Sequence, residues 1–292
     1  MTCPDCFRGG VVVGDPKGTI ETLFDVPTYV ANPEGAPPSP STIVYFTDAF
    51  GLDLVNNKVL ADAYASATGI RVLVPDIIPG GPMPVWVLDT VESVMSPVGL
   101  FDIFGQMNRI SALFSTLLQF IPFIYRARPT IPATFNTCLK YARRVKADLP
   151  AGGKLGIAGF CWGGYLSVNL CTHTAQVGGE ERLVDAAFAA HPSFLTVPNN
   201  IVDSILKFKT PLSIAHAEND VNLKTPGIEQ TEAALRQKAG DGNGEDGFHY
   251  QIKTYKGMAH GFAVRAKSGV EAQEKAADEA KVQATEWFKK FL

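Results

Sequence analysis

The most informative stretch of the chain is Lys154-Leu-Gly-Ile-Ala-Gly-Phe-Cys161-Trp-Gly-Gly164. Its first half predicts a buried strand, and the residues after Cys161 suit the start of a helix. Gly159 and Gly163 flank Cys161 at a spacing of two, which is typical of a sharp strand-to-helix turn that exposes the central side chain. Larger side chains at the two glycines would collide with neighbouring backbone when the central residue takes a strained conformation. The stretch therefore predicts a nucleophile above the edge of a sheet.

Cysteine at the centre of this turn indicates thiol chemistry. The following helix would direct its first N–H groups at Cys161, which lowers the pKa of a thiol and prepares one donor for an oxyanion. The same Gly-x-Cys-x-Gly spacing also arises from packing alone. Its position between a buried strand and a helix favours the catalytic interpretation.

Compact apolar runs alternate with helical segments along most of the chain. Continuous apolar runs predict strands covered on both faces, and helical segments between them predict parallel crossovers. We therefore expect a mostly parallel central sheet with helices on both faces, preceded by a hairpin. The predicted strands are 19–23, 27–31, 42–46, 71–75, 154–158, 183–190, 211–217 and 248–255, and the predicted helices are 53–67, 133–146, 225–239 and 270–292.

Residues at about 80–131 interrupt this alternation with many aromatic and aliphatic side chains and few charges. Insertions of this size commonly form lids or binding elements. We expect a single domain, 1–292, whose helical, lid-like insertion folds over the carboxyl edge of the sheet and supplies Trp86 as a candidate substrate contact. The uncharged stretch 110–125 is shorter than the roughly 20 residues that span a bilayer and predicts a buried or lid helix. Extra core helices without a ligand role are the alternative interpretation of the insertion.

An acid and a histidine follow the later predicted strands. In a fold with a nucleophile turn, the partners come in the order nucleophile, acid, histidine, each after a later strand. Asp220 lies in the turn after strand 211–217, and His260 lies in the loop after strand 248–255. Asp220 would orient the imidazole, which would exchange protons with Cys161. Glu218 is the alternative acid, and Asp220 is favoured because it lies deeper in the turn.

The other histidines fit structural roles better than catalytic ones. His191, at another predicted strand end, is a candidate for lining the substrate pocket, whereas His216 lies within a strand and is expected to be a hydrogen-bonded core residue. His173 and His249 fit a helix face and a loop. None of these residues has the spacing of metal ligands. We expect no metal site.

Cysteine usage and charge limit the partners and the compartment. The chain has five cysteines, an odd number, and begins without an apolar signal segment, so we expect a cytoplasmic protein. Cys3 and Cys6 form a single pair without further ligands at zinc spacing, which predicts a mobile tail, and Cys138 and Cys171 are expected to be buried. The net charge of −3, without a basic stripe, predicts no nucleic-acid partner. Glycine-rich phosphate loops are absent, so no cofactor is expected.

The motifs together resemble the dienelactone hydrolase (carboxymethylenebutenolidase) family, and the likeness covers roughly residues 18–292. The resemblance is carried by the nucleophile turn, by Val74-Pro-Asp76, by the acid turn and by two further segments. These segments are Thr47-Asp-Ala-Phe-Gly51 and His260-Gly-Phe-Ala-Val-Arg265. The resemblance implies an α/β-hydrolase fold and the hydrolysis of a small-molecule ester or lactone.

For individual residues, the resemblance implies a Cys–His–Asp triad of Cys161, His260 and Asp220. It places an acidic residue at Asp48, which would hold and activate the resting thiol. Well-known bacterial members carry glutamate there, one methylene longer. The oxyanion donors would be the backbone N–H groups of Trp162 and Ala49.

Substrate recognition is implied less completely. Arg265 matches one of the arginines that bind the carboxylate of dienelactone in this family. The second arginine has no counterpart after Val74-Pro-Asp76, and apolar groups cannot replace a guanidinium clamp. With the apolar insertion, this predicts a bulkier or more hydrophobic ester than dienelactone.

Two functional hypotheses follow from the sequence. The first is a thiol-nucleophile hydrolase, and the second is a catalytically idle scaffold that serves as a binding or thiol-sensing protein with an oxidisable Cys161. The presence of all three triad residue types at strand ends favours the first. We expect a monomer or homodimer without membrane contact.

Overall fold

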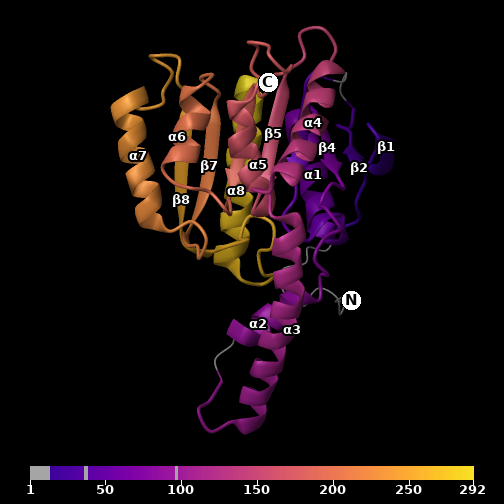
Figure 1. Ribbon diagram of the computed structural model, residues 1–292, viewed down its shortest axis with the longest axis vertical. Helices are drawn as coiled ribbons and strands as arrows, with labels where there is room; N and C mark the ends of the chain where they lie inside the picture. The colour runs from indigo at the N-terminus through magenta and orange to yellow at the C-terminus, as the bar shows by residue number, and fades with distance from the viewer. Residues whose placement is uncertain (1–13, 36–38, 96–97) are drawn as a thin grey trace.

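The computed structural model describes residues 14–35, 39–95 and 98–292, and its centre is one eight-stranded sheet (Figure 1). The strand order is β1-β2-β4-β3-β5-β6-β7-β8. The pairs β1–β2 and β2–β4 are antiparallel, and all later pairs are parallel. The predicted hairpin and mostly parallel sheet are both confirmed.

The strands are short and largely apolar, as their burial requires. Every residue of β3, β5 and β6 is buried, whereas β1 at the edge of the sheet is mostly exposed. The strands are β1 Thr19–Leu23, β2 Val26–Ala31, β3 Thr42–Phe46, β4 Arg71–Pro75, β5 Leu155–Phe160, β6 Ala186–Ala190, β7 Leu212–Asn219 and β8 Tyr250–Ala259.

Helices cover both faces of the sheet. Helices α1 and α8 pack against each other on one face, and α5 and α6 pack on the other (Figure 1). Aromatic contact between Phe135 of α4 and Tyr165 of α5 places α4 beside α5. The helices are α1 Val55–Thr68, α2 Val87–Met95, α3 Ile103–Ala127, α4 Pro132–Ala147, α5 Trp162–Asn169, α6 Asn199–Leu206, α7 Thr225–Ala239 and α8 Glu271–Phe291, with short 3-10 turns η2 Gly51–Asp53 and η3 Leu170–Thr172.

In the body of the protein, the observed strands and helices differ from the predicted ones only in segments whose hydrophobic pattern is weak. The strand expected at 183–190 begins only at residue 186, and β8 continues four residues beyond the predicted end. Helix α6 was not predicted, because its eight residues are too few for a clear period. Cys138 and Cys171 are buried as expected, while Cys3 and Cys6 lie outside the described residues.

The insertion differs most from expectation. We expected it to fold over the sheet, whereas α2 and α3 pack on each other and project from the body as an arm (Figure 1). Only 11% of the most apolar part of α3 is buried, so the segment 110–125 is not a buried helix. The carboxyl end of α3 enters the body, where Phe123 and Ala127 are buried, and Val87 at the start of α2 is buried in the same core. The arm leaves the body at the edge where the parallel strands end.

Candidate active site

The turn after β5 forces the side chain of Cys161 out of the sheet. Cys161 has φ 50° and ψ −107°, a strained conformation for a residue with a side chain. A Cβ atom on Gly159 would lie 2.2 Å from the carbonyl oxygen of Gly163, and one on Gly163 would lie 2.1 Å from that of Phe46. Both glycines are therefore required by contact with backbone. The Gly163 N–H also donates to the Thr47 carbonyl at 3.0 Å, which joins the turn to the segment after β3.

Two strand ends bring an acid and a histidine together. Asp220 follows β7 and His260 follows β8, and Nδ1 of His260 lies 2.9 Å from Oδ2 of Asp220. Asp220 also accepts hydrogen bonds from the backbone N–H groups of Asn222 and Leu223. Glu218, the alternative acid, instead accepts from the N–H of Gly257 at 2.8 Å. The carboxylate that orients His260 is thus that of Asp220.

The electrostatics of this cluster link the thiol to the imidazole. Burial opposes ionisation of Cys161, but His260 and Arg265 outweigh it and hold the pKa of the thiol below its usual value. Burial likewise opposes protonation of His260, yet the Cys161 thiolate and the Asp220 carboxylate raise the pKa of the imidazole above its ordinary range. Burial would raise the pKa of Asp220, and its hydrogen bond to His260 lowers it. The three groups therefore shift one another's pKa in the directions that neighbouring opposite charges produce.

The second imidazole nitrogen has no fixed partner. Nε2 of His260 is buried and makes no hydrogen bond within the described part of the chain. The Ser193 hydroxyl lies within hydrogen-bonding distance of the Cys161 sulfur, at 3.5 Å. Ser193 also donates its backbone N–H to the carbonyl of Cys161 at 3.0 Å. Sequence reasoning missed Ser193, although its place three residues after the end of β6 puts it at the same edge of the sheet.

Asp48 and Arg265 contact each other rather than acting separately. The guanidinium of Arg265 forms an ion pair with Oδ2 of Asp48, whose side chain is fully buried. Oδ1 of Asp48 accepts from Asn57 and from the backbone N–H of Phe50, each at 3.1 Å. No hydrogen bond joins Asp48 to Cys161 among the described residues. The charge of Asp48 nevertheless raises the pKa of the thiol, whereas that of Arg265 lowers it.

The two expected oxyanion donors lie at the ends of adjacent strands. Ala49 follows β3 and Trp162 follows Cys161, and neither backbone N–H donates to another group of the described chain. The insertion is bonded to both residues. The N–H of Met83 donates to the Ala49 carbonyl at 2.8 Å, and the indole of Trp162 donates to the Ala127 carbonyl at 2.6 Å.

The remaining predicted contacts lie in different surroundings. His191 is fully buried behind His260, with ring centroids 5.0 Å apart in an edge-to-face arrangement. Burial, followed by the charges of His260 and Arg265, holds the pKa of His191 well below its usual value, so the ring is neutral. Trp86, just before α2, is 46% exposed, and no described hydrogen bond or ring contact joins it to Cys161. His216 is a core residue bonded to the Thr225 hydroxyl, as expected.

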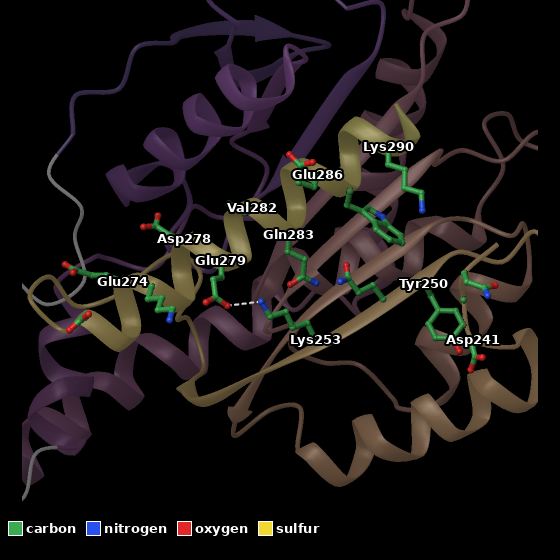
Figure 2. A pocket seen from close by; sticks show the side chains of 16 residues that line it. Asp241, Tyr250, Lys253, Glu274, Asp278, Glu279, Val282, Gln283, Glu286 and Lys290 are labelled. Carbon is green, nitrogen blue, oxygen red and sulfur yellow. Dashed lines mark hydrogen bonds and ion pairs between the residues drawn. The ribbon is translucent and has the colours of Figure 1, made fainter. Parts of the chain in front are cut away.

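A large groove lies away from these groups. It has a volume of about 1110 Å³ and runs between α8 and β8. Figure 2 shows the charged side chains that line it, with an ion pair between Lys253 and Glu279 at 2.8 Å. None of Cys161, His260 and Asp220 lines this groove. Its charged lining suits a solvated surface rather than an apolar substrate site.

An eight-stranded, mostly parallel sheet that carries a strained nucleophile turn after β5 and is covered by helices on both faces defines an α/β-hydrolase. The chain belongs to the dienelactone hydrolase family, whose family model matches residues 26–292. It is therefore a hydrolase of esters or lactones.

Individual relatives cover nearly the whole chain. The chain is 30% identical over 292 residues to the hydrolase tropI of Talaromyces stipitatus, an alignment that covers 98% of this chain and 95% of that protein. It is 25% identical over 264 residues to dienlactone hydrolase 1 of Gibberella moniliformis, covering 90% and 83%. The crystal structure of a putative dienelactone hydrolase from Klebsiella pneumoniae shares the fold, with a TM-score of 0.60, 18% identity and coverage of 91% and 93%.

Proposed function

We propose that the chain hydrolyses an ester or lactone through Cys161 as the nucleophile, with His260 as the acid–base group and Asp220 as its orienting partner. The observation that carries this proposal is the 2.9 Å contact between Asp220 and Nδ1 of His260. This contact fixes the tautomer of the ring and leaves Nε2 without a partner. The lowered pKa of the neighbouring thiol supports the same assignment.

In the first half of the reaction, the Cys161 thiolate attacks the carbonyl carbon, and the carbonyl oxygen gains a negative charge. The free N–H groups of Ala49 and Trp162 would stabilise this oxyanion. The intermediate collapses to a thioester, the bond to the alkoxide oxygen breaks, and the alkoxide takes the proton from Nε2 of His260. A lactone would open in this step while remaining bound as one acyl chain.

In the second half, His260 acts as a base. Its Nε2 takes a proton from a water molecule, and the hydroxide attacks the thioester carbonyl. The tetrahedral intermediate then collapses, the carbon–sulfur bond breaks, and the carboxylic acid leaves. Cys161 is restored as a thiolate beside the protonated His260. The negative Asp220 stabilises the imidazolium formed in this step, which requires the contact to Nδ1 described above.

In this proposal, Arg265 tunes the charge of the nucleophile rather than binding substrate. Its guanidinium contacts Asp48 and lowers the pKa of Cys161. A substrate carboxylate that approached Arg265 would compete with Asp48 for the same guanidinium. An uncharged, more hydrophobic ester does not require this competition. We therefore propose a neutral ester or lactone as the substrate class.

The test combines steady-state hydrolysis of aryl esters and enol-lactones with intact-mass detection of an acyl adduct. We expect Cys161→Ala to abolish both turnover and the adduct, whereas Cys138→Ala, which alters a buried thiol far from the site in sequence, retains both. Turnover by the Cys161 variant at the wild-type rate would overturn the proposal. The thiol-sensing alternative would be indicated by a different result: mild peroxide converts Cys161 to a reversible sulfenic acid, and the protein hydrolyses none of the esters.

A further inference from the structure

Helix α3 turns its large apolar side chains toward solvent. Ile103, Phe104, Met107, Ile110 and Phe114 are each more than 60% exposed. The other exposed apolar residues of the helix are Leu113, Leu117, Leu118, Phe120, Ile121 and Tyr125. At roughly 200 Å² for a large side chain, this face presents on the order of 1,000 Å² of apolar surface. The largest patch on a monomer is usually about 300–600 Å².

The opposite face of α3 is small and polar, and α2 covers it. The hydroxyl groups of Thr90 and Thr116 are hydrogen bonded at 2.8 Å between the two helices. Ala112, Ser115 and Gln119 on the same side of α3 are partly buried. A helical hairpin that functions alone in water would bury its apolar face and expose its polar one. Helix α3 does the reverse, since its apolar side chains are exposed and its small polar side is covered by α2, so its outer face is suited to a second contact.

The spacing of the exposed residues identifies the kind of contact. Six of them follow alternating steps of four and three residues, the repeat of a coiled-coil seam. We call these residues the α3 seam: Ile103, Met107, Ile110, Phe114, Leu117 and Ile121. The only charged residues of α3, Arg109 and Arg126, both lie outside the seam and its flanks. The seam therefore suits another helix of the same character.

The seam is complementary to itself in the antiparallel direction. When two copies of α3 are placed about a twofold axis at the level of residue 112, Met107 faces Leu117 of the second copy. Ile110 then faces Phe114, and Ile103 faces Ile121, so each seam residue meets a seam residue. This is the isologous contact that a twofold dimer requires.

Charge argues against a lipid surface as the occupant. Helix α3 is long and apolar enough to cross a membrane by length and composition. Residues 87–127, however, hold three acidic and two basic side chains, a net charge of −1, and the whole chain carries −3. Helices that lie on membranes are rich in lysine and arginine, which attract anionic lipids. The arm lacks this attraction, whereas its aromatic and methionine content is typical of protein interfaces.

We propose that α3 is the interface of a homodimer, in which two copies of the chain pair their α3 seams antiparallel. The apolar area of the face reaches the roughly 800 Å² per partner of a standard interface. In this dimer the exposed tip residues Leu100 and Phe101 lie against the base of the partner copy's arm. The proposal does not depend on which residue is the nucleophile.

The first test measures the mass of the full chain by sedimentation or light scattering across a dilution series. We expect a dimer for the wild type. Phe114→Asp places a charge in the seam and should raise the dimer dissociation constant at least about 100-fold. Asn108→Asp adds the same charge at an exposed position outside the seam and should stay dimeric. Circular dichroism and thermal unfolding check that both variants fold, and Ile110→Asp provides a second seam variant.

The second test distinguishes the direction of pairing by oxidative cross-linking. In the antiparallel dimer, a mixture of Met107→Cys and Leu117→Cys proteins should form a mixed disulfide-linked dimer. Met107→Cys alone should not cross-link beyond the wild-type background, because two copies of residue 107 lie about 15 Å apart along the axis. Cross-linking of Met107→Cys alone would overturn the antiparallel arrangement.

Two outcomes would overturn the interface itself. One is a monomeric wild type at tens of micromolar protein, and the other is a Phe114→Asp variant that is as dimeric as Asn108→Asp. Flotation with vesicles of phosphatidylcholine and phosphatidylserine, performed on the same variants, identifies the rival occupant. A monomer that binds these vesicles through Phe114 would replace the homodimer by a lipid contact.

Discussion

The indole N–H of Trp162 donates a 2.6 Å hydrogen bond to the carbonyl oxygen of Ala127, the last residue of α3. The residue that follows Cys161 is thereby bonded to the base of the arm. Both groups are buried, so neither can exchange this bond for one to water. The contact connects the nucleophile turn with a helix that is otherwise largely outside the body.

Removing this bond should destabilise the protein. Trp162→Phe leaves the Ala127 carbonyl without its donor and creates a cavity, and we expect the free energy of unfolding to fall by about 2–4 kcal/mol. Urea denaturation measures the change. Trp86→Phe, at a position that is 46% exposed, serves as the control and should cost less than about 1 kcal/mol. Equal losses in the two variants would contradict a structural role for the bond.

The reactivity of Cys161 should depend on pH through His260. A thiolate reacts with iodoacetamide and a thiol does not, so the alkylation rate rises as pH passes the pKa of the thiol. Because the imidazolium lowers this pKa, the wild-type midpoint should lie below that of an ordinary cysteine. His260→Gln removes the positive charge, and burial together with Asp48 should then move the midpoint to higher pH.

Intact mass spectrometry at a series of pH values gives both profiles. The site of alkylation is checked by repeating the wild-type series with Cys161→Ser. An unchanged or lower midpoint in His260→Gln would show that the histidine does not act on the thiol.

The two candidate acids should differ strongly in their effect on activity. Asp220→Asn keeps the shape of the side chain but no longer stabilises the His260 imidazolium, and kcat should fall about 10²–10⁴-fold. Glu218→Gln should change kcat less than about 5-fold, because the Glu218 carboxylate accepts from the backbone N–H of Gly257 and makes no hydrogen bond or ion pair with His260 among the described residues. Ester hydrolysis by both purified variants decides the matter, and a larger loss in Glu218→Gln would reverse the assignment.

The buried ion pair of Asp48 and Arg265 should show strong coupling. Asp48→Asn or Arg265→Met alone leaves one charge buried without its partner and should cost about 3–5 kcal/mol. The double variant should lose markedly less than the sum of the two, since no unpaired charge remains. Urea denaturation of all four proteins completes the cycle. Additive losses would mean that the two side chains are stabilised independently.

Several features of this protein follow from local sequence alone. The turn at Cys161 could be predicted because two glycines are needed where the backbone atoms of 159 and 163 approach each other closely. Apolar runs such as Thr42–Phe46 identified the buried strands. The order of Cys161, Asp220 and His260 along the chain gave the candidate triad, because parallel strands end at one edge of a sheet.

Tertiary structure decided how charged groups pair and where the insertion lies. Sequence could not show that Arg265 contacts Asp48, because the two residues are 217 positions apart and meet only when the chain folds. Sequence likewise could not show that Ser193 lies beside the sulfur of Cys161, because this contact also forms only on folding. The apolar residues of 103–127 predict a helix whether they face a core, a lid or a second molecule. Only the tertiary structure, in which α2 packs on the polar side of α3, shows that the apolar side of α3 faces outward.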